Sequence, residues 1–292
     1  MKKERWIVVV VALVIAVGVA ALAAPARVTL SLSEMEAYVG QRLEVRVVGV
    51  ASGEEVLRVI ATAIAAGSFD LVLEPLETEA ACRIDLYVDV NGDGWYDRPP
   101  DDAAWRVDLG TVVGEATVSL SATAEMTDVD WPPASDGAIA PEEYRHVLID
   151  EGTGVVLFWQ NDATTLYVGL VGPGTGWVAV GFGARNQMQG ANIVIGAVTD
   201  GVLTLEDQFG SGPFSHRGDK VSSLLQRGGS EVDGKTIIEF ALPLATGEAD
   251  DVALTPGQTV TVILAFHATS DSLTTKHTRR STVTITLDEE AR

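Results

Sequence analysis

A methionine and four histidines are the side chains with the most distinctive chemistry in this chain. Met188 lies in a polar loop between two apolar segments, 177–182 and 192–196, where the backbone is free to direct a side chain at a ligand. An iron held between a thioether and an imidazole has both axial positions filled, so no site is left for oxygen or substrate. Such a centre transfers electrons. Met188 and one histidine would supply its two donors.

The other methionines suit this role less well. Met35 lies in an early acidic segment, Met126 lies in a polar run, and Met1 would be lost with a cleaved signal peptide. Without further context, Met188 is better explained as a partly exposed loop methionine, since methionine commonly fills irregular space.

The histidines differ in their surroundings. His267 ends the β-branched segment 259–267 and shares a face with Ile263 and Ala265, which favours a core or rim position. His216 lies in a polar loop, and we expect it to be solvated. His277 lies between a polar turn and the predicted last strand, 281–287.

Several motifs together resemble the DOMON domain, an extracytoplasmic β-sandwich that binds haem b or sugars. Trp177 to Gly196, taken with His277, is the specific part of the resemblance. The opening Asp136-Gly137-Ala138-Ile139 and the pair Glu143-Tyr144 are similar to the start of DOMON domains and of family-nine carbohydrate-binding modules. The resemblance covers a little over half of the chain.

The resemblance implies a ligand set. In the family pattern the haem histidine stands just before the last strand, which corresponds to His277, opposite Met188. Some bacterial relatives use a lysine at this point, so Lys276 is an alternative ligand, and His267 is another. Trp177 and Phe182 would line the pocket or the core.

Cationic side chains near His277 suit the propionates of haem. Lys276, Arg279 and Arg280 form a basic turn, which would otherwise be solvated. The resemblance therefore implies an electron-transfer protein that passes electrons to or from an extracytoplasmic redox partner or a membrane electron-transfer complex.

The alternative function is a carbohydrate-binding module without haem. Trp159, Trp177 or Tyr167 would then stack on a sugar ring, although aromatic residues in strands more often belong to the core. No nucleophile motif, phosphate loop or zinc-protease motif is present, so we expect a carrier or binding protein rather than an enzyme.

Composition excludes other classes. The net charge of −21 argues against nucleic acid, whose phosphates would be repelled. Cys82 is the only cysteine, which excludes an intrachain disulfide and the CxxCH attachment of a c-type haem, so any haem would be noncovalent.

The N-terminus predicts export. Basic residues precede an apolar run from Trp6 to about Ala24, followed by small residues suited to signal peptidase. Residues 1–26 are therefore a signal peptide or an uncleaved membrane anchor, and the protein is secreted or membrane-tethered on the extracytoplasmic side.

The remaining chain predicts two antiparallel β-sandwich domains. Short alternating segments separated by turns predict one sandwich over 28–127, whose role is unknown. Residues 128–133, with paired prolines, are the predicted linker, and 134–289 form the DOMON-like domain. Residues 56–64 fit either a strand or a short helix.

One loop of the first domain resembles the start of an EF-hand calcium loop. Oxygen-bearing side chains alternate along it, and Trp95 would contribute its carbonyl oxygen. The expected ligands are Asp89, Asn91, Asp93, Trp95 and Asp97. Position twelve is Pro100 rather than glutamate, so Asp101 or Asp102 would have to complete the shell, and a tight acidic β-turn is the alternative.

Overall fold

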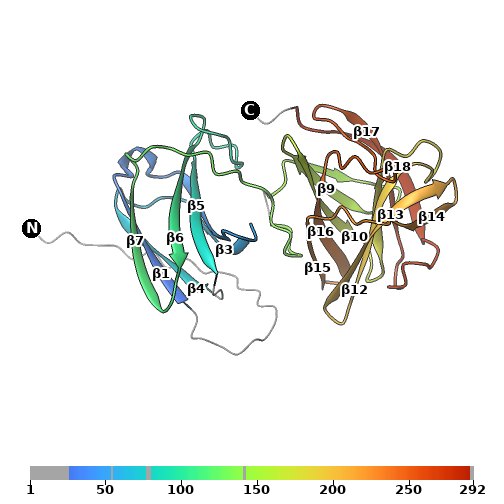
Figure 1. The fold of residues 1–292 in the computed structure, drawn as a ribbon, viewed down its shortest axis with the longest axis horizontal. Helices are drawn as coiled ribbons and strands as arrows, with labels where there is room; N and C mark the ends of the chain where they lie inside the picture. The colour runs from blue at the N-terminus through green and yellow to red at the C-terminus, as the bar shows by residue number, and fades with distance from the viewer. Residues whose placement is uncertain (1–25, 54, 77–79, 141–142, 290–292) are drawn as a thin grey trace, which may run out of the picture. The chain divides into compact units, whose positions relative to one another are not determined.

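The computed structural model describes residues 26–53, 55–76, 80–140 and 143–289. Their regular elements are β-strands apart from one short 3₁₀ helix, η1 (Glu36–Tyr38), which confirms the predicted all-β class. The chain divides into two compact units, one ending at Trp131 and one beginning at Pro132. In Figure 1 the first unit runs from blue to green and the second from green to red.

The first unit is a sandwich of two sheets, with strand orders β4-β1-β7 and β3-β2-β5-β6. All of its pairings are antiparallel except that of β1 with β7, which is parallel. Residues 55–61 form a strand, so the segment for which the sequence allowed a strand or a short helix is a strand. The strands are β1 (Ala26–Ser33), β2 (Arg42–Gly49), β3 (Glu55–Ala61), β4 (Phe69–Leu76), β5 (Ala81–Asp89), β6 (Ala103–Thr111) and β7 (Glu115–Ser121).

Alternation along the strands builds the core of this unit. In β1, Val28, Leu30 and Leu32 are buried while the residues between them are more exposed, as expected for a sheet with one apolar face. Trp105 is the largest of the fully buried side chains, and Cys82 is buried in the same core. The lone cysteine therefore serves as a small hydrophobic residue.

The end of the predicted linker packs against the first unit. Trp131 lies 4.8 Å from the ring of Tyr87, and the guanidinium of Arg46 lies 4.6 Å from the Trp131 ring centre. Arg46 and Arg106 both donate to the carbonyl of Val129 and both bind the fully buried Asp85. Residues 129–131 thus cover an outer face of β2 and β5.

The second unit is a larger sandwich, with sheet orders β15-β16-β10-β9-β8 and β14-β13-β12-β11-β17-β18. All of its strand pairings are antiparallel. The strands are β8 (His146–Ile149), β9 (Val156–Asn161), β10 (Thr165–Gly172), β11 (Val178–Phe182), β12 (Asn192–Thr199), β13 (Val202–Gly212), β14 (Ser215–Gly218), β15 (Gln226–Val232), β16 (Lys235–Pro243), β17 (Thr259–Phe266) and β18 (Arg279–Thr286).

Two central strands of the six-stranded sheet are buried on both faces. Every residue of β11 is buried, as are the first seven residues of β12. One face packs into the main core, and the other belongs to a small apolar cluster that includes Trp177, Ala179 and Ile195. Loops must therefore cover the outer face of this sheet.

The Asp-Gly-x-Ile and Glu-Tyr motifs hold an N-terminal strap onto the five-stranded sheet. The N–H of Gly137 and the hydroxyl of Tyr144 donate to the two carboxylate oxygens of the fully buried Glu239, at 2.8 and 2.9 Å. Gly137 has a φ of +85°, and a Cβ there would lie 2.7 Å from the backbone of Gly229, so no other residue fits easily.

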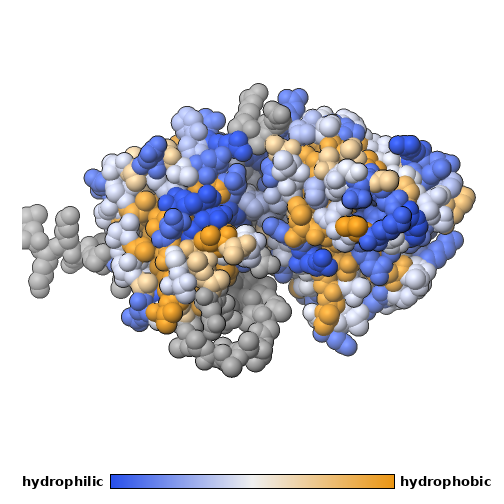
Figure 2. Space-filling model, viewed as in Figure 1, coloured by the Kyte–Doolittle hydropathy of each residue, from blue (hydrophilic) through white to orange (hydrophobic). Residues whose placement is uncertain are grey.

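The visible face of each unit is mixed in polarity. Figure 2 shows hydrophilic side chains interspersed with smaller hydrophobic areas on the visible face of each unit. Within the described residues, no helix is long and apolar enough to cross a membrane. Residues 1–25 of the predicted signal or anchor segment lie outside those residues.

Candidate functional site

A cavity of about 650 Å³ lies on the outer face of the six-stranded sheet of the second unit. Its floor consists of two rows of side chains, each formed by residues that are paired across β17, β11 and β12. One row is Ala265, Ala179 and Ile195, and the other is Ile263, Gly181 and Ile193. Small residues in the central strand leave room above an apolar floor, which is typical of a ligand pocket.

Met188 reaches the cavity from the loop between β11 and β12. A turn joins Asn186 to Gln189, whose N–H donates to the Asn186 carbonyl at 3.0 Å, and Gln187 has a φ of +55°. The Met188 carbonyl accepts the N–H of Ala191 at 3.0 Å. A Cβ on Gly210 would lie 1.7 Å from that carbonyl oxygen, so β13 approaches the loop closely and fixes the backbone of Met188.

His277 reaches the same cavity from the loop between β17 and β18. This loop is tied to the sheet by two bonds of Trp177: its carbonyl accepts the N–H of His267 at 2.8 Å, and its N–H donates to Ser270 at 3.0 Å. The N–H of Thr278 donates to Phe266 at 2.7 Å. Met188 and His277, eighty-nine positions apart in the printed sequence, thus line one cavity.

The cavity is cationic although the chain is strongly acidic. Lys276 and Arg280 line it, and none of the described residues that line it is an aspartate or glutamate. Burial lowers the pKa of His277, and the neighbouring charges of Arg280 and Lys276 lower it further. Its imidazole is therefore kept neutral near physiological pH, which is the form that binds metal.

Trp177 presents an unsatisfied donor at the cavity wall. Its side chain is 4% exposed, and its indole Nε1 is buried without a hydrogen-bond acceptor among the described residues. Leaving a buried donor unpaired costs about 1–3 kcal/mol. A ligand with an acceptor group would remove that cost, so the site favours a ligand that is both apolar and anionic.

Two of the predicted pocket residues lie elsewhere. Phe182 is buried in the main sandwich core, and Arg279 does not line the cavity. Trp177 and Phe182 are five positions apart, so alternation places them on opposite faces of the sheet. Arg280, opposite Ala265 on β17, faces the cavity instead of Arg279.

His216 and Phe214, from the β13–β14 hairpin, also line the cavity. We expected His216 to be solvated. It is exposed at its outer side, but its Nδ1 bonds to Gln208 Oε1, and burial lowers its pKa. The hairpin bulge that brings these residues over the sheet has no clear signature in the sequence.

The remaining histidines have other partners. His267 Nδ1 accepts the N–H groups of Thr269 and Ser270, as expected for a rim histidine. His146 bonds to Asp288 at 2.6 Å and stacks on Trp159 at 5.0 Å. Neither lines the cavity.

The aromatic residues considered for sugar binding are all buried. Trp159 is 7% exposed and donates its indole N–H to Thr286, while Tyr167 is 9% exposed and donates its hydroxyl to Asp162. With Trp177 also buried, none of these three rings offers an open stacking face.

The acidic loop of the first unit binds its own backbone. Asp89 accepts the N–H groups of Gly92 and Gly94, and Asp93 accepts that of Trp95. The Asn91 amide donates to Asp93 and Asp97. Asp102, whose pKa burial raises to about 6, accepts the N–H groups of Val90 and Asp97. These bonds fit the acidic-turn alternative, and calcium binding here stays a prediction.

The second unit is thus a β-sandwich with a ligand cavity on the outside of one sheet. Residues 151–267 match the family model of the DOMON domain. The C-terminal half of the chain therefore contains a DOMON domain, which confirms the resemblance inferred from its sequence. The matched range includes Met188 and ends before His277.

Two known proteins are similar to part of the chain. DBH-like monooxygenase protein 1 of Mus musculus is 30% identical over 136 residues, which are 46% of this chain and 22% of that protein. The chain therefore spans only a small part of that relative. The crystal structure of the cytochrome b domain of pyranose dehydrogenase from Coprinopsis cinerea has a TM-score of 0.42 and 14% identity, over 48% of this chain and 80% of that one.

Proposed function

We propose that the DOMON unit binds haem b noncovalently in the cavity on its six-stranded sheet and acts as an electron carrier. Met188 and His277 are the proposed axial ligands. The observation that carries the proposal is their convergence on one cavity from separate loops. Haem bound in this way supplies one-electron transfer without an open coordination site.

The cavity residues suit the three chemical parts of haem. The apolar floor of β11, β12 and β17 matches the porphyrin ring, and a glycine at its centre leaves the space flat. A thioether and a neutral imidazole match the iron. Lys276, Arg280 and the unpaired Trp177 N–H match two propionates.

The site supports haem better than sugar. A sugar site needs an exposed aromatic face, whereas Trp159, Trp177 and Tyr167 are at most 9% exposed. A cationic wall and a thioether suit an anionic ligand that carries a metal better than a neutral sugar.

The cell context is also part of the proposal. We propose that the protein is exported, secreted or held by its N-terminal segment, and exchanges electrons with an extracytoplasmic protein or membrane complex. Any catalysis, such as the oxygen insertion that the name of the mouse relative describes, belongs to a partner in this proposal.

The test is an absorption spectrum of the full chain produced in haem-replete cells, before and after dithionite. Sharp reduced bands of a six-coordinate b-type haem are the expected result. A visible spectrum that stays flat after hemin is added would exclude haem binding, and a glycan-binding screen would follow.

Ligand variants then assign the iron donors. Met188→Ala and His277→Ala should each abolish the low-spin His/Met spectrum while near-ultraviolet circular dichroism shows an intact fold. Met126→Ala, at an exposed methionine outside the cavity, is the matched control and should leave the spectrum unchanged. Lys276→Ala distinguishes the alternative ligand, because it should alter the spectrum only if lysine binds the iron.

A further inference from the structure

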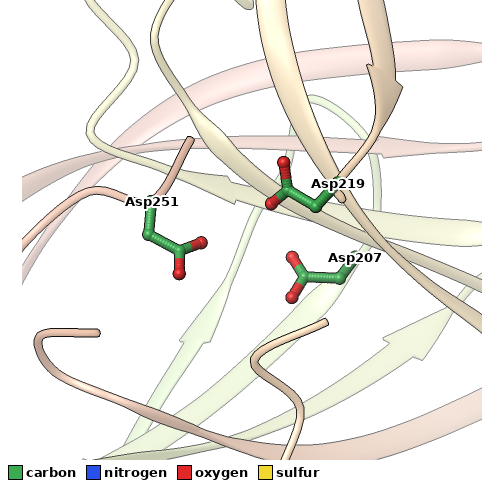
Figure 3. A group of neighbouring side chains, drawn as sticks. All are labelled: Asp207, Asp219 and Asp251. Carbon is green, nitrogen blue, oxygen red and sulfur yellow. The ribbon is translucent and has the colours of Figure 1, made fainter. Parts of the chain in front are cut away.

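Three aspartates of the DOMON unit converge away from the haem cavity residues. Asp207 lies in β13, Asp219 directly follows β14, and Asp251 lies in the loop between β16 and β17. One carboxylate oxygen from each lies within 4.8 Å of the others. Figure 3 shows the three carboxylates pointing toward one another.

The hairpin register forces two of these charges together. The N–H of Asp219 donates to the carbonyl of Asp207 at 3.0 Å, so the two residues continue the β13–β14 ladder as opposite neighbours. Like charges directly opposite in a sheet are destabilising. Arg217 does not neutralise them directly, because its guanidinium binds Asp250 at 2.7 Å.

Acceptor atoms without donors accumulate at this cluster. Asp207 is 8% exposed and its Oδ1 has no hydrogen-bond partner among the described residues; neither carboxylate oxygen of Asp219 has one either. The ordinary explanation, a solvated acidic surface, does not fit atoms that are buried.

Asn192 adds a fourth side chain and independent evidence. It is 3% exposed, and its amide is held at the cluster because Nδ2 donates to Asp251 Oδ1 at 3.1 Å. Its own Oδ1 is buried without a partner. The cluster therefore combines buried carboxylate oxygens of three aspartates with a buried amide oxygen of Asn192, and its nearest cation, Arg217, is paired with Asp250.

We propose that Asn192, Asp207, Asp219 and Asp251 bind a structural calcium ion. Calcium takes six to eight oxygen ligands at about 2.3–2.6 Å, so opposite ligands of one ion lie up to about 5 Å apart. Magnesium holds its ligands at about 2.0–2.1 Å and keeps several waters, so it suits this set less well. Zinc prefers nitrogen and sulfur donors, which the four side chains lack.

The ion would join three parts of the unit that are separate in sequence. It would tie the start of β12, the β13–β14 hairpin and the loop that carries Asp251. Asp251 is already fixed by the hydroxyls of Ser223 and Thr246, at 2.6 and 2.5 Å, so part of the site is preorganised. This site is independent of whether haem binds.

The experiment is calorimetric titration of the chelator-treated full chain with calcium chloride at 150 mM salt, with thermal unfolding measured in parallel. Wild type should bind one ion at this site and unfold at a higher temperature when calcium is added. Asp219→Asn should weaken that binding at least about tenfold, because the number of charged ligands sets affinity.

Two controls make the result decisive. In chelator alone, Asp219→Asn should unfold at a higher temperature than wild type, because it removes a like-charge repulsion; this also shows that the variant folds. Asp233→Asn, at the exposed turn between β15 and β16, should leave the binding step unchanged.

Three outcomes would overturn the proposal. The first is a wild-type unfolding temperature that calcium does not move, which would mean that protons or water satisfy the cluster. The second is calcium binding that Asp219→Asn leaves as strong as in wild type. The third is a calcium-induced rise in unfolding temperature that is equal in wild type and Asp219→Asn, which would indicate diffuse screening of an acidic protein.

Discussion

Neighbouring residues of a β-strand face opposite sides of the sheet, and this alternation selects the side chains that meet at the cavity. Ala179 and Gly181 face the cavity, whereas Val178, Phe182 and the side chain of Val180 belong to the core. A change of one position therefore moves a residue from ligand contact to structural packing.

Arg279 and Arg280 provide a test of this alternation. Arg280 lies opposite Ala265 at the cavity, while Arg279 lies opposite the core residue Phe266. Arg280→Gln should weaken hemin binding about three- to fivefold, roughly 0.6–1 kcal/mol for an exposed ion pair. Arg279→Gln should change it little. Hemin titration at low and high salt measures both, and the difference should shrink with salt. An equal loss in both variants would contradict the assignment.

Gly181 provides a second test, because it forms the centre of the floor. A Cβ there would lie 2.8 Å from Ile263 Cγ1 and 3.0 Å from Ile193 Cγ1, so the isoleucines would be pushed into the cavity. Gly181→Ala should lower hemin affinity at least about tenfold, since shape complementarity is lost, with a cost in stability of about 1–3 kcal/mol.

The control for this change is Gly152→Ala, where a Cβ would meet its nearest atoms at 3.5 Å, an ordinary contact. Hemin titration and thermal unfolding of both variants give the comparison. Unchanged hemin affinity in Gly181→Ala would place the ring elsewhere.

Some of these site residues follow from the sequence alone. Met188 and His277 could be proposed because a loop methionine and a histidine before the last strand match a family pattern. The alternation of side chains along a strand also predicts that Trp177 and Phe182 lie on opposite faces of the sheet. Choosing Arg280 over Arg279 needed the pairing register of β17 with β18, which periodicity does not specify.

At the scale of elements, buried polar side chains fix how separate segments meet. Glu239 of β16 holds the strap at Gly137 and Tyr144, and it has no cationic partner among its hydrogen bonds. Burial raises its pKa to about 8, and the charges of Glu143 and Asp136 contribute in the same direction. The folded protein therefore retains a proton that the unfolded chain releases near its ordinary pKa of 4.5.

This predicts a pH dependence of stability. The pKa of Glu239 is raised in the folded protein, so its contribution to the free energy of unfolding is fully present below about pH 4.5. That contribution is lost as pH rises toward 8, by up to about 1.4 kcal/mol per pH unit. Glu239→Gln should flatten this decline. Asp102 and Asp219 titrate near 6, and the lowered pKa values of His216 and His277 contribute equally to wild type and Glu239→Gln, so the difference between their urea unfolding from pH 6.5 to 8 isolates Glu239. Glu231→Gln, at an exposed position of β15, should keep the wild-type slope. A slope unchanged by Glu239→Gln would contradict this assignment.

Elements also show where prediction from the sequence ends. Alternating segments predict strands such as β1 and β2, because one face of each must be buried. The aspartate cluster is different: Asp207, Asp219 and Asp251 are distributed over forty-five positions of the printed sequence, and only the hairpin register and a long loop bring them together. No motif at that spacing identifies them.

At the scale of the whole molecule, each unit has its own core. One large cluster, including Trp105, lies in the first unit, and another, including Phe240, lies in the second. Units with separate cores commonly unfold as separate cooperative steps. Charge is also unevenly distributed at this scale. The chain has a net charge of −21, yet none of the described residues that line the cavity is an aspartate or glutamate. That contrast favours an anionic ligand over a general effect of composition.

A ligand specific to one unit should therefore stabilise only that unit. Hemin at about 100 times its dissociation constant should add roughly 2.7 kcal/mol to the DOMON unit, which raises its unfolding midpoint by about 5–10 °C at this size. Differential scanning calorimetry of the full chain should show one transition that moves and one that stays. Trp105→Phe, a change in the first core, should lower only the transition that hemin leaves unmoved. If hemin and Trp105→Phe shift the same transition, the two cores unfold together, because in independently unfolding units each change would move only the transition of its own unit.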